Sequence, residues 1–598
     1  MFKIIKQLFS LLTPLQRRNF YYLQSLVIVT ALLEIVGVAS IVPFMALIGD
    51  ISQLQEDSIF GNLFLASGIT SEFKFVLIVA FIVLAMLIIA SLCSIFTIWR
   101  LQKFAHNTGA ELADRLYSHY LKQDWLFHAS GNSSNLTKKI ATETPRTTQG
   151  IIVSVMSMNA KIVLALFVTI TIFIYDPKVA ISGFLIFSTA YFLIFSLVKK
   201  RLQNNGKNIS EVYQERFTLM NEGFGGIKDI LLLGRDSDFI KRFKHSGQRM
   251  AYSLSNNAAL AQAPRYFIEL VAFGSIILLV IYLFSNHNGD LGTILPSISI
   301  YAIASIKILP AFQSIYSSIA DIRANFAAFE SIHQDLVDSS ETLSLKSEKY
   351  ETIAAPKENI LIENVTFKYE TKGELILNQI HMDIPVNTTV GIVGPSGSGK
   401  STLIDILLGL IQPQEGHLKI DNIIIDNKNR RSWQNSIGFV AQSIFLSDAT
   451  FAENVAFGIS KDQINFDRVR KSLEMAHLID LVDSLENGIN TRVGERGVQL
   501  SGGQRQRIGI ARALYHEADV FIFDEATSSL DGITEQMIMD AINNFTGKKT
   551  IILIAHRLKT VKDCDKIFFI NNGQVTDSGT YNELIETNID FKKMASHS

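Results

Sequence analysis

Six long apolar stretches fill most of the first half of the chain and constrain its fold more than any other feature. They are residues 21–47, 75–99, 151–175, 179–198, 266–285 and 293–319. Each is long enough to cross the hydrocarbon core of a bilayer, which takes about 20 helical residues. One such stretch is compatible with a buried helix of a soluble protein, but six in succession are not. The sequence therefore predicts six transmembrane helices.

The charges between these stretches predict the orientation in the membrane. Residues 1–20 carry four basic and no acidic side chains, whereas the loop after the first stretch is mainly acidic. Because basic flanks stay in the cytoplasm, the N-terminus is predicted to be cytoplasmic, and an even number of spans returns the second half to the same side. The inner segments 100–150 and 199–265 favour helix, so we expect spans that continue far into the cytoplasm.

Composition excludes several other classes of protein. The chain has 55 Lys+Arg and 56 Asp+Glu, a balance that argues against a protein that coats nucleic acid. Its two cysteines, Cys93 and Cys564, make neither a disulfide framework nor a metal cluster. The mean hydropathy of +0.24 averages an apolar half and an ordinary half.

In the loop after the first span, apolar residues 59–65 predict a short outer helix, which lies either on the membrane surface or on the chain's own helices.

A polar segment, 338–359, separates the apolar half from a region of different character. Region 360–598 alternates short β-branched strands with helical patterns, which predicts an α/β fold with a largely parallel core sheet. The predicted organisation is a transmembrane domain over 1–337, a linker over 338–359 and an α/β domain over 360–598.

A phosphate-binding loop follows the strand predicted at 390–393. Residues 394–401 fit the pattern G-x-x-x-x-G-K-[ST], and a helix begins at Thr402. Glycines let backbone N–H groups wrap nucleotide phosphates, and the helix N-terminus adds a favourable field. Lys400 is predicted to reach the β- and γ-phosphates and Ser401 to hold Mg²⁺. The predicted ATP-binding residues of the loop are Gly394, Pro395, Ser396, Gly397, Ser398, Gly399, Lys400, Ser401 and Thr402.

The apolar strand at 520–523 ends in two acidic residues. We predict that Asp524 makes a second Mg²⁺ contact and that Glu525 polarises the attacking water, because phosphoryl transfer needs positioning and charge neutralisation. Two acids at a strand end also occur as a structural cap, but the phosphate-binding loop favours the catalytic interpretation.

A second anion site is predicted at the start of the helix that begins near residue 504. Ser501, Gly502, Gly503 and Gln504 place backbone amides and a hydroxyl at a positive helix end. The two anion sites become one if two copies pack head to tail, each presenting this turn to the other's γ-phosphate. With this motif the sequence closely resembles the ATP-binding cassette (ABC) transporters, specifically exporter-type half-transporters.

The resemblance covers nearly the whole chain and implies roles for four further residues. It implies that Tyr369 stacks on adenine and that Gln442 senses Mg²⁺ and links the cassette to the membrane domain. It also implies that Asp531 lies in the loop that crosses the cassette dimer and that His556 contacts the γ-phosphate. No hydrolytic motif is degraded. Both sites of a homodimer are therefore expected to hydrolyse ATP.

The fold implied by the resemblance is a membrane domain of six transmembrane helices with long cytoplasmic extensions, followed by an α/β P-loop cassette. That cassette has an antiparallel β subdomain and a helical subdomain. The implied mechanism is alternating access, in which ATP closes the cassette dimer and hydrolysis reopens it. The implied cofactors are ATP and Mg²⁺, and the implied partner is a second copy or a related chain, with no nucleic acid. The implied location is the bacterial inner membrane, with the cassette in the cytoplasm.

Ionisable residues on the predicted spans are candidates for contact with the cargo, because they are costly in a membrane. They are Glu34, Lys161, Arg265, Glu269 and Lys307. Arg265 and Glu269 lie four positions apart on one helix face, so either they form an ion pair or Arg265 binds an anion. The sequence leaves both alternatives open.

Residues 33–44 and 264–269 are similar to the lipid-linked oligosaccharide flippases of bacterial protein glycosylation. That resemblance implies a polyprenyl-pyrophosphate-linked oligosaccharide as the cargo, with Arg265, Glu269 and Glu34 as the substrate candidates. Two alternatives stay open: an exporter of another lipid, a drug or a peptide, and an ATP-gated channel or membrane regulator.

Overall fold

The structure is a computed structural model. It describes residues 2–49, 54, 59–131, 133–286, 291–344, 351–369, 373–494, 497, 500–525, 532–543, 545–555 and 557–597. Contacts divide the chain into a helical unit, Met1–Gln123 with Phe127–Lys346, and an α/β unit, Asp124–Leu126 with Ser347–Ser598. The division falls inside the predicted 338–359 linker.

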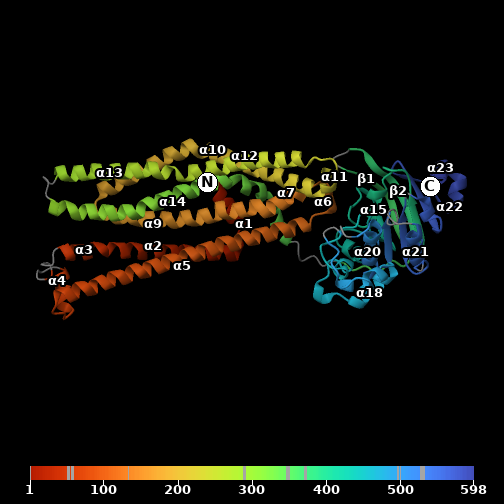
Figure 1. Cartoon of the computed structure of the whole chain (residues 1–598), viewed down its shortest axis with the longest axis horizontal. Coiled ribbons are helices and arrows are strands. Elements are labelled where there is room, and N and C mark those ends of the chain that lie inside the picture. The colour runs from red at the N-terminus through yellow and green to blue at the C-terminus, as the bar shows by residue number, and fades with distance from the viewer. Residues whose placement is uncertain are drawn as a thin grey trace. The chain divides into compact units, whose positions relative to one another are not determined.

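The helical unit consists of long helices joined by short ones (Figure 1). Its elements are α1 (Phe2–Leu11), α2 (Pro14–Ala39), α3 (Ile41–Gly49), α4 (Ile59–Ala66), α5 (Glu72–Leu121), α6 (Trp125–Ser130), α7 (Ser133–Lys138), the π-helix η2 (Lys139–Glu143), α8 (Thr144–Thr147), the π-helix η3 (Thr148–Val153), α9 (Ser154–Tyr175), α10 (Pro177–Gly225), α11 (Ile227–Leu232), α12 (Asp236–Gln262), α13 (Pro264–Asn286) and α14 (Leu291–Ser344).

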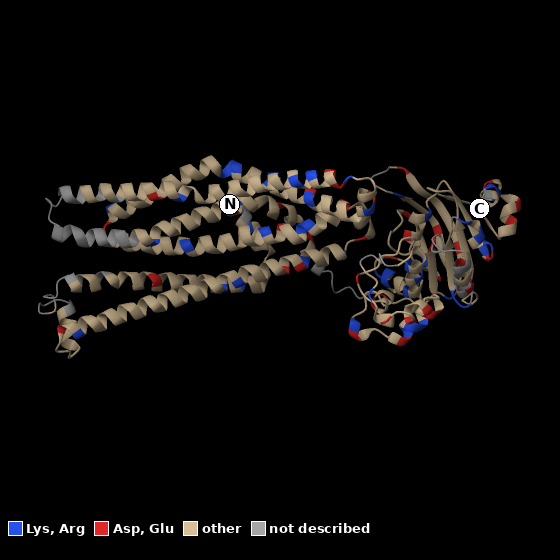
Figure 2. Ribbon diagram, in the orientation of Figure 1, with Lys and Arg blue, Asp and Glu red and all other residues tan. Residues whose placement is uncertain are grey.

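The longest helices are much longer than a membrane is thick. Helix α5 has 50 residues and α14 has 54. At 1.5 Å per residue these helices span about 75 and 80 Å, whereas the hydrocarbon core is about 30 Å thick. The apolar stretches of the long helices carry few charged side chains, and their extensions carry more (Figure 2). The expectation of spans that continue far beyond the membrane is therefore confirmed.

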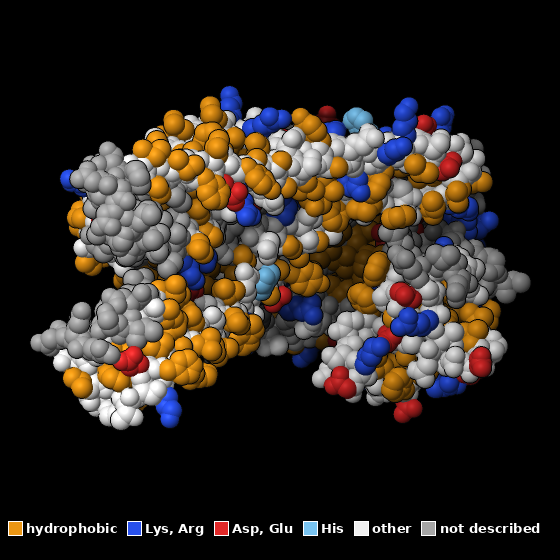
Figure 3. All heavy atoms as spheres, turned by 60° about the vertical axis from the view of Figure 1, so that its left-hand side comes forward, with side chains coloured by type: hydrophobic (Ala, Val, Ile, Leu, Met, Phe, Trp, Pro, Cys, Tyr) orange, Lys and Arg blue, Asp and Glu red, His pale blue; other side chains and the backbone are white. Residues whose placement is uncertain are grey.

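Four described helices are long and apolar enough to cross a membrane: Pro14–Met45, Glu72–Leu121, Ser133–Ile174 and Pro177–Gly225. Helices α13 and α14 cover the fifth and sixth predicted stretches, but both include side chains outside the described part of the chain. The total of six spans stays a prediction. Hydrophobic side chains cover much of the visible surface of the helical unit (Figure 3), as a lipid-facing surface requires.

Local sequence signals fix where these helices begin. Thr13 caps α2 by accepting a hydrogen bond from the backbone N–H of Gln16, and the Gln16 side chain caps Thr13 in return. Asp176 caps α10 in a similar way, with Pro177 at the first helical position. The predicted short outer helix is present as α4. Its Phe64 ring meets Phe75 of α5 edge-on at 5.3 Å between centroids, so α4 packs on the chain's own helices.

The α/β unit has two sheets and a set of covering helices. Its elements are β1 (Asn359–Lys368), β2 (Leu375–Pro385), β3 (Thr389–Val393), α15 (Lys400–Leu407), β4 (Glu415–Ile420), β5 (Ile423–Ile424), α16 (Arg430–Asn435), β6 (Ile437–Val440), α17 (Phe451–Val455), η5 (Lys461–Gln463), α18 (Phe466–Met475), α19 (Ile479–Asp483), η6 (Gly488–Asn490), α20 (Gly502–Tyr515), β7 (Val520–Asp524), α21 (Gly532–Asn543), β8 (Thr550–Ile554), η8 (Leu558–Val561), β9 (Lys566–Asn571), β10 (Gln574–Gly579), α22 (Tyr581–Thr587) and α23 (Ile589–His597).

The larger sheet has the strand order β10-β9-β3-β8-β7-β6 and is parallel from β9 to β6. The smaller sheet, β2-β1-β4-β5, is antiparallel. Every residue of β3 and β8 is buried, as expected of central strands of a parallel sheet. Because parallel strands end at one edge of a sheet, the segments after β3, β6, β7 and β8 gather there. The predicted fold class, a helical membrane domain followed by an α/β cassette, is confirmed.

Candidate functional site

The loop between β3 and α15 wraps around the ammonium group of Lys400. Lys400 Nζ lies 2.8 Å from the carbonyl oxygen of Gly394 and 2.9 Å from that of Pro395. Burial lowers the pKa of Lys400, and the nearby carboxylates of Glu525 and Asp524 act in the opposite direction. The cation is therefore held inside the loop and close to both acidic residues.

Two glycines of this loop have backbone conformations that other residues rarely adopt. Gly397 has a φ of +81° and Gly399 a φ of +101°. A Cβ atom on Gly399 would lie 2.8 Å from a side-chain carbon of Leu377 and 2.9 Å from the carbonyl oxygen of Ile376. The side chain of Ser398 is buried, and its hydroxyl has no hydrogen-bond partner among the described residues. A concave loop that holds a cation before a helix N-terminus fits a nucleotide phosphate.

Glu525 lies just after β7, and neighbours from two other elements hold it. Gln442, in the segment after β6, donates to Glu525 Oε2 at 2.6 Å. Gln506 of α20 donates to the backbone carbonyl of Glu525 at 3.2 Å. The residue has a φ of 50°, in the left-handed region that non-glycine residues seldom occupy. The structure thus brings together Glu525 and Gln442, which the sequence places 83 positions apart.

The predicted adenine platform lies beside the start of α15. The Tyr369 hydroxyl is 3.2 Å from Thr402 Oγ1, and its ring meets Phe367 edge-on at 5.1 Å between centroids. The predicted ligands of Mg²⁺, Ser401, Gln442 and Asp524, offer hydroxyl, amide and carboxylate oxygens, which suit a hard cation.

The signature turn begins α20 with a reciprocal cap. Ser501 Oγ accepts from the backbone N–H of Gln504 at 3.2 Å, and the Gln504 side chain accepts from the N–H of Ser501 at 2.8 Å. This capping box holds Gly502 and Gly503 in the first turn, whose backbone N–H groups point out of the helix end. Asp531 and His556, the other two predicted residues of the site, lie outside the described residues.

Three contacts of the α/β unit were not predicted from the sequence. The first is the bond from Gln506 to Glu525. The second joins Trp125 to Asp405 of α15, since the indole N–H donates to the carboxylate at 3.2 Å. In the third, the residue before Trp125, Asp124, pairs with Arg430 at 3.1 Å. The only sequence signal was that Trp125 lies in the helix-favouring inner segment 100–150.

Within the helical unit, four of the five predicted cargo residues are paired with protein groups, and the fifth, Lys161, lines a cavity together with Glu34. Arg265 Nε lies 2.6 Å from Glu269 Oε1, so the structure contains the ion pair that was one of the two open alternatives. Glu34 accepts from Ser94 at 2.5 Å, and Lys307 Nζ lies 3.5 Å from its other oxygen.

A phosphate-binding loop, acidic residues at a strand end and a capped signature turn, joined to membrane-crossing helices, define an ATP-driven membrane transporter. Comparison with protein families agrees. The ABC transporter family model matches residues 377–528, and the model of the ABC transporter transmembrane region matches residues 39–306. The chain belongs to the ABC transporters, and its cassette is an ATP-hydrolysing transporter ATPase.

Two known proteins are similar to this chain in sequence, and one solved structure is similar to it in fold. The ATP-dependent lipid A-core flippase of Ralstonia nicotianae is 30% identical over 397 residues, which cover 66% of this chain and 66% of that protein. The ATP-dependent lipid A-core flippase of Escherichia coli is 27% identical over 508 residues, which cover 84% of this chain and 86% of that protein. A bacterial Atm1-family ABC exporter with ATP bound has a TM-score of 0.79 and 19% identity, covering 97% of this chain and 98% of that chain. At this identity the structural likeness shows the fold alone.

Proposed function

We propose that this protein flips a polyprenyl-pyrophosphate-linked oligosaccharide across the bacterial inner membrane, with its N-terminus and cassette in the cytoplasm. The observation that carries the proposal is a charged cluster on the predicted spans. Glu34 of α2 is bonded to Ser94 of α5 and paired with Lys307 of α14. Such a cluster is costly in a membrane. A cargo with phosphate and sugar groups explains why charged and polar side chains lie on these predicted spans, whereas an apolar cargo does not explain them.

In this proposal two copies of the chain form a homodimer that binds ATP and Mg²⁺. Lys400 and the loop around it hold the phosphates, Ser401, Asp524 and Gln442 hold Mg²⁺, and Glu525 orients the attacking water. Bound Mg²⁺ would neutralise charge on the phosphates. His556 and Asp531 complete the site by the family resemblance.

The proposal is tested by flipping in vesicles. The purified protein is reconstituted with a fluorescent polyprenyl-pyrophosphate glycan, and the fraction of label protected from an external quencher is followed with and without ATP. We expect ATP-dependent movement of this lipid and no movement of an unphosphorylated polyprenyl glycan. Movement of neither lipid, in a preparation that hydrolyses ATP, contradicts the proposed cargo.

A second candidate cargo is a lipid A-core glycolipid, because the relatives that are 27% and 30% identical are lipid A-core flippases. It is also an amphipathic lipid with a polar glycan. The same vesicles loaded with labelled lipid A-core separate the two candidates, because the lipid that moves faster at equal concentration identifies the cargo class.

A further inference from the structure

Two neighbouring helical segments of the helical unit carry polar side chains along one face. On α14 these residues recur at intervals of three and four, which places them on one side of the helix. They are Ser314, Ser317, Ser318, Asp321 and Asn325. The facing polar residues of η3 and α9 are Gln149, Ser154, Ser157 and Lys161.

Two cavities lie along these two faces. A cavity of about 400 Å³ lies between them, from Arg146 and Asn325 to Ser157 and Ser314. A second cavity, of about 180 Å³, has Ser157 and Ser314 in its own wall and extends to Lys161, Glu34 and residues of α5. The two cavities share Ser157 and Ser314 in their walls, and together they are called here the serine groove. From Arg146 to Lys161 it follows 15 residues, which is about 22 Å of helix.

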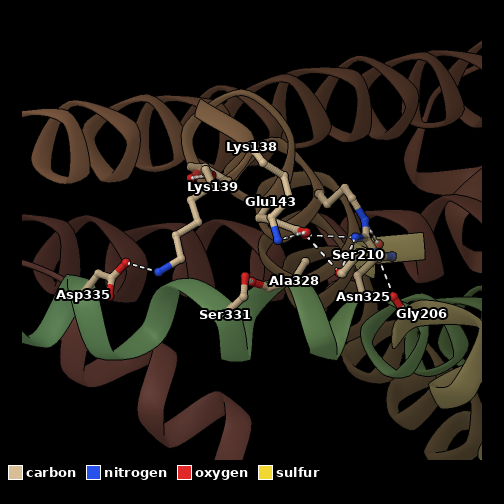
Figure 4. A network of polar contacts seen from close by, with 11 residues as sticks. Lys138, Lys139, Glu143, Gly206, Ser210, Asn325, Ala328, Ser331 and Asp335 are labelled. Atoms are coloured by element: carbon tan, nitrogen blue, oxygen red, sulfur yellow. Dashed lines mark hydrogen bonds and ion pairs between the residues drawn. The ribbon is translucent and has the colours of Figure 1, made fainter. Parts of the chain in front are cut away.

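The arginine at one end of the serine groove is already neutralised. Arg146 lies 2.8 Å from a carboxylate oxygen of Glu143, a fully buried residue, and donates to Ser210 at the same distance. Figure 4 shows this network around Glu143, Ser210 and Asn325. Breaking such a buried pair leaves an uncompensated charge, so Arg146 serves to hold the helices together.

The lysine at the other end, Lys161, lies deep within a predicted span. Lys161 lies ten positions inside the predicted span 151–175, about 15 Å deep and thus near the centre of the hydrocarbon core. Within the described residues no ion pair joins Lys161 to a carboxylate. Glu34 lines the same cavity, but Ser94 and Lys307 already engage its carboxylate. A cation at this depth needs a counter-charge, and a ligand can supply it.

We propose that the serine groove carries the phosphate-bearing head of the cargo, with Lys161 as its anion contact. This inference rests on the proposed function and names the part of the protein that recognises the head. The serine hydroxyls both donate and accept hydrogen bonds, which suits sugar hydroxyls. A lysine ammonium is a compact point charge that suits a phosphate without demanding one geometry.

The groove can be tested without any cargo. Ser157→Cys, one helical turn from Lys161, is introduced into full-length protein with Cys93→Ala and Cys564→Ala. Its rates of reaction with an anionic and a cationic methanethiosulfonate reagent are compared in membranes. A water-filled groove with a free cation predicts faster reaction with the anionic reagent. Adding Lys161→Gln should lower the ratio of the anionic-reagent rate to the cationic-reagent rate by about threefold or more. The reason is that this substitution removes a positive charge close to the reacting thiol.

Two controls decide the result. Lys178→Gln, which removes an exposed lysine at the start of α10, should leave the ratio unchanged. Ile89→Cys, an apolar position of α5 at similar depth, should react at least tenfold more slowly than Ser157→Cys with either reagent. A rate ratio unaffected by Lys161→Gln, or a Ser157→Cys that reacts as slowly as Ile89→Cys, overturns the proposal.

A second measurement uses the cargo. In vesicles, Lys161→Gln should raise the concentration of polyprenyl-pyrophosphate glycan that half-stimulates the ATPase by about tenfold, as expected when a charge-assisted contact is lost. Lys161→Arg should restore the wild-type value, and Lys178→Gln should retain it. An unchanged concentration in Lys161→Gln counts against the groove. If phosphate-bearing glycolipids fail to stimulate the ATPase activity of the wild type, the proposed function is wrong. The serine groove is then tested by the methanethiosulfonate rate ratios alone, which do not depend on the cargo.

Discussion

At the scale of single residues, the carboxylate of Glu525 is fixed by contacts that its immediate sequence does not contain. Gln442, in the segment after β6, donates to the carboxylate, and Gln506 of α20 donates to the backbone carbonyl of the same residue, whose φ is left-handed. A carboxylate held in this way can position a water molecule without reorganising first.

We therefore expect Glu525→Gln to lose ATP hydrolysis by about 10²-fold or more and to keep ATP binding, because the amide preserves the size of the side chain but not its charge. Phosphate release by the purified protein and binding of a fluorescent ATP analogue measure the two effects. Glu517→Gln, which removes an exposed carboxylate paired with Arg468, is the control. Turnover at the wild-type rate in Glu525→Gln would refute the role assigned to this residue.

The residues of the nucleotide site that the sequence could predict are those in motifs of fixed order. The pair of Gln442 and Glu525 follows from two strands that end at one sheet edge, and the structure contains it. The contact between Trp125 and Asp405 joins residues 280 positions apart, and no motif links them. For Arg265, spacing alone allowed an ion pair or an anion site, since side-chain direction depends on packing.

At the scale of elements, the crossing of α10 and α14 depends on a glycine. A Cβ atom at Gly206 would lie 2.0 Å from the backbone carbonyl oxygen of Ala324. Backbone atoms inside a helix yield little, so the two helices have to move apart if the side chain grows.

Gly206→Ala should therefore destabilise the protein by about 1–3 kcal/mol, although alanine is the better helix former. The unfolding midpoint of the purified protein measures this effect. Gly183→Ala, in the same helix, is the matched control because a Cβ there meets nothing within 4 Å. The midpoint should fall in the first variant and stay equal or rise in the second. Equal midpoints in the two variants would show that α10 and α14 do not meet closely at this point.

Helix α15 provides a pH-dependent contribution to stability. Partial burial raises the pKa of Asp405 to about 6, although the bond from Trp125 opposes the shift. A raised pKa means that the folded state binds the proton more tightly than the unfolded state. The stabilisation is complete below the ordinary value near 4 and is lost as the pH rises through about 6.

We expect Asp405→Asn to remove this dependence while its side-chain oxygen still accepts from Trp125. The variant should gain stability relative to wild type as the pH rises from 4 to 6, by about 1–2 kcal/mol because solvent screens this half-buried carboxylate, with a constant difference above that range. Unfolding midpoints of both proteins from pH 4 to 8 measure the effect. Parallel curves over the whole range would contradict the assigned pKa.

The elements that the sequence predicts well are those with long, consistent patterns. The long helices and the core strands follow from apolar stretches and β-branched runs. The π-helical segments η2 and η3 were not predicted, because a change of hydrogen-bond register leaves no mark in composition. Within η3, Gly150 allows close packing on α14, since a Cβ there would lie 2.2 Å from the side-chain nitrogen of Asn325.

At the scale of the whole molecule, one chain is predicted to hold two half-sites for ATP. The phosphate-binding loop and the signature turn are each predicted to bind anions, and both Ser396 and Ser501 have exposed side chains. We therefore expect two copies to complete two nucleotide sites by packing head to tail. A dimer whose copies met through their membrane helices alone would leave both half-sites separate.

Cross-linking between copies distinguishes these arrangements. In full-length protein with Cys93→Ala and Cys564→Ala, Ser396→Cys in one copy should be joined to Ser501→Cys in a differently tagged copy by a short bismaleimide, because both residues would flank one nucleotide. The product should increase with ATP and Mg²⁺ when Glu525→Gln prevents hydrolysis, since bound nucleotide then holds the two cassettes together. Two copies that both carry Ser501→Cys alone should give little product, because head-to-tail packing keeps the signature turns apart. Equal yields from the mixed and the matched pairs, with and without ATP, would exclude the head-to-tail dimer and with it the shared nucleotide site.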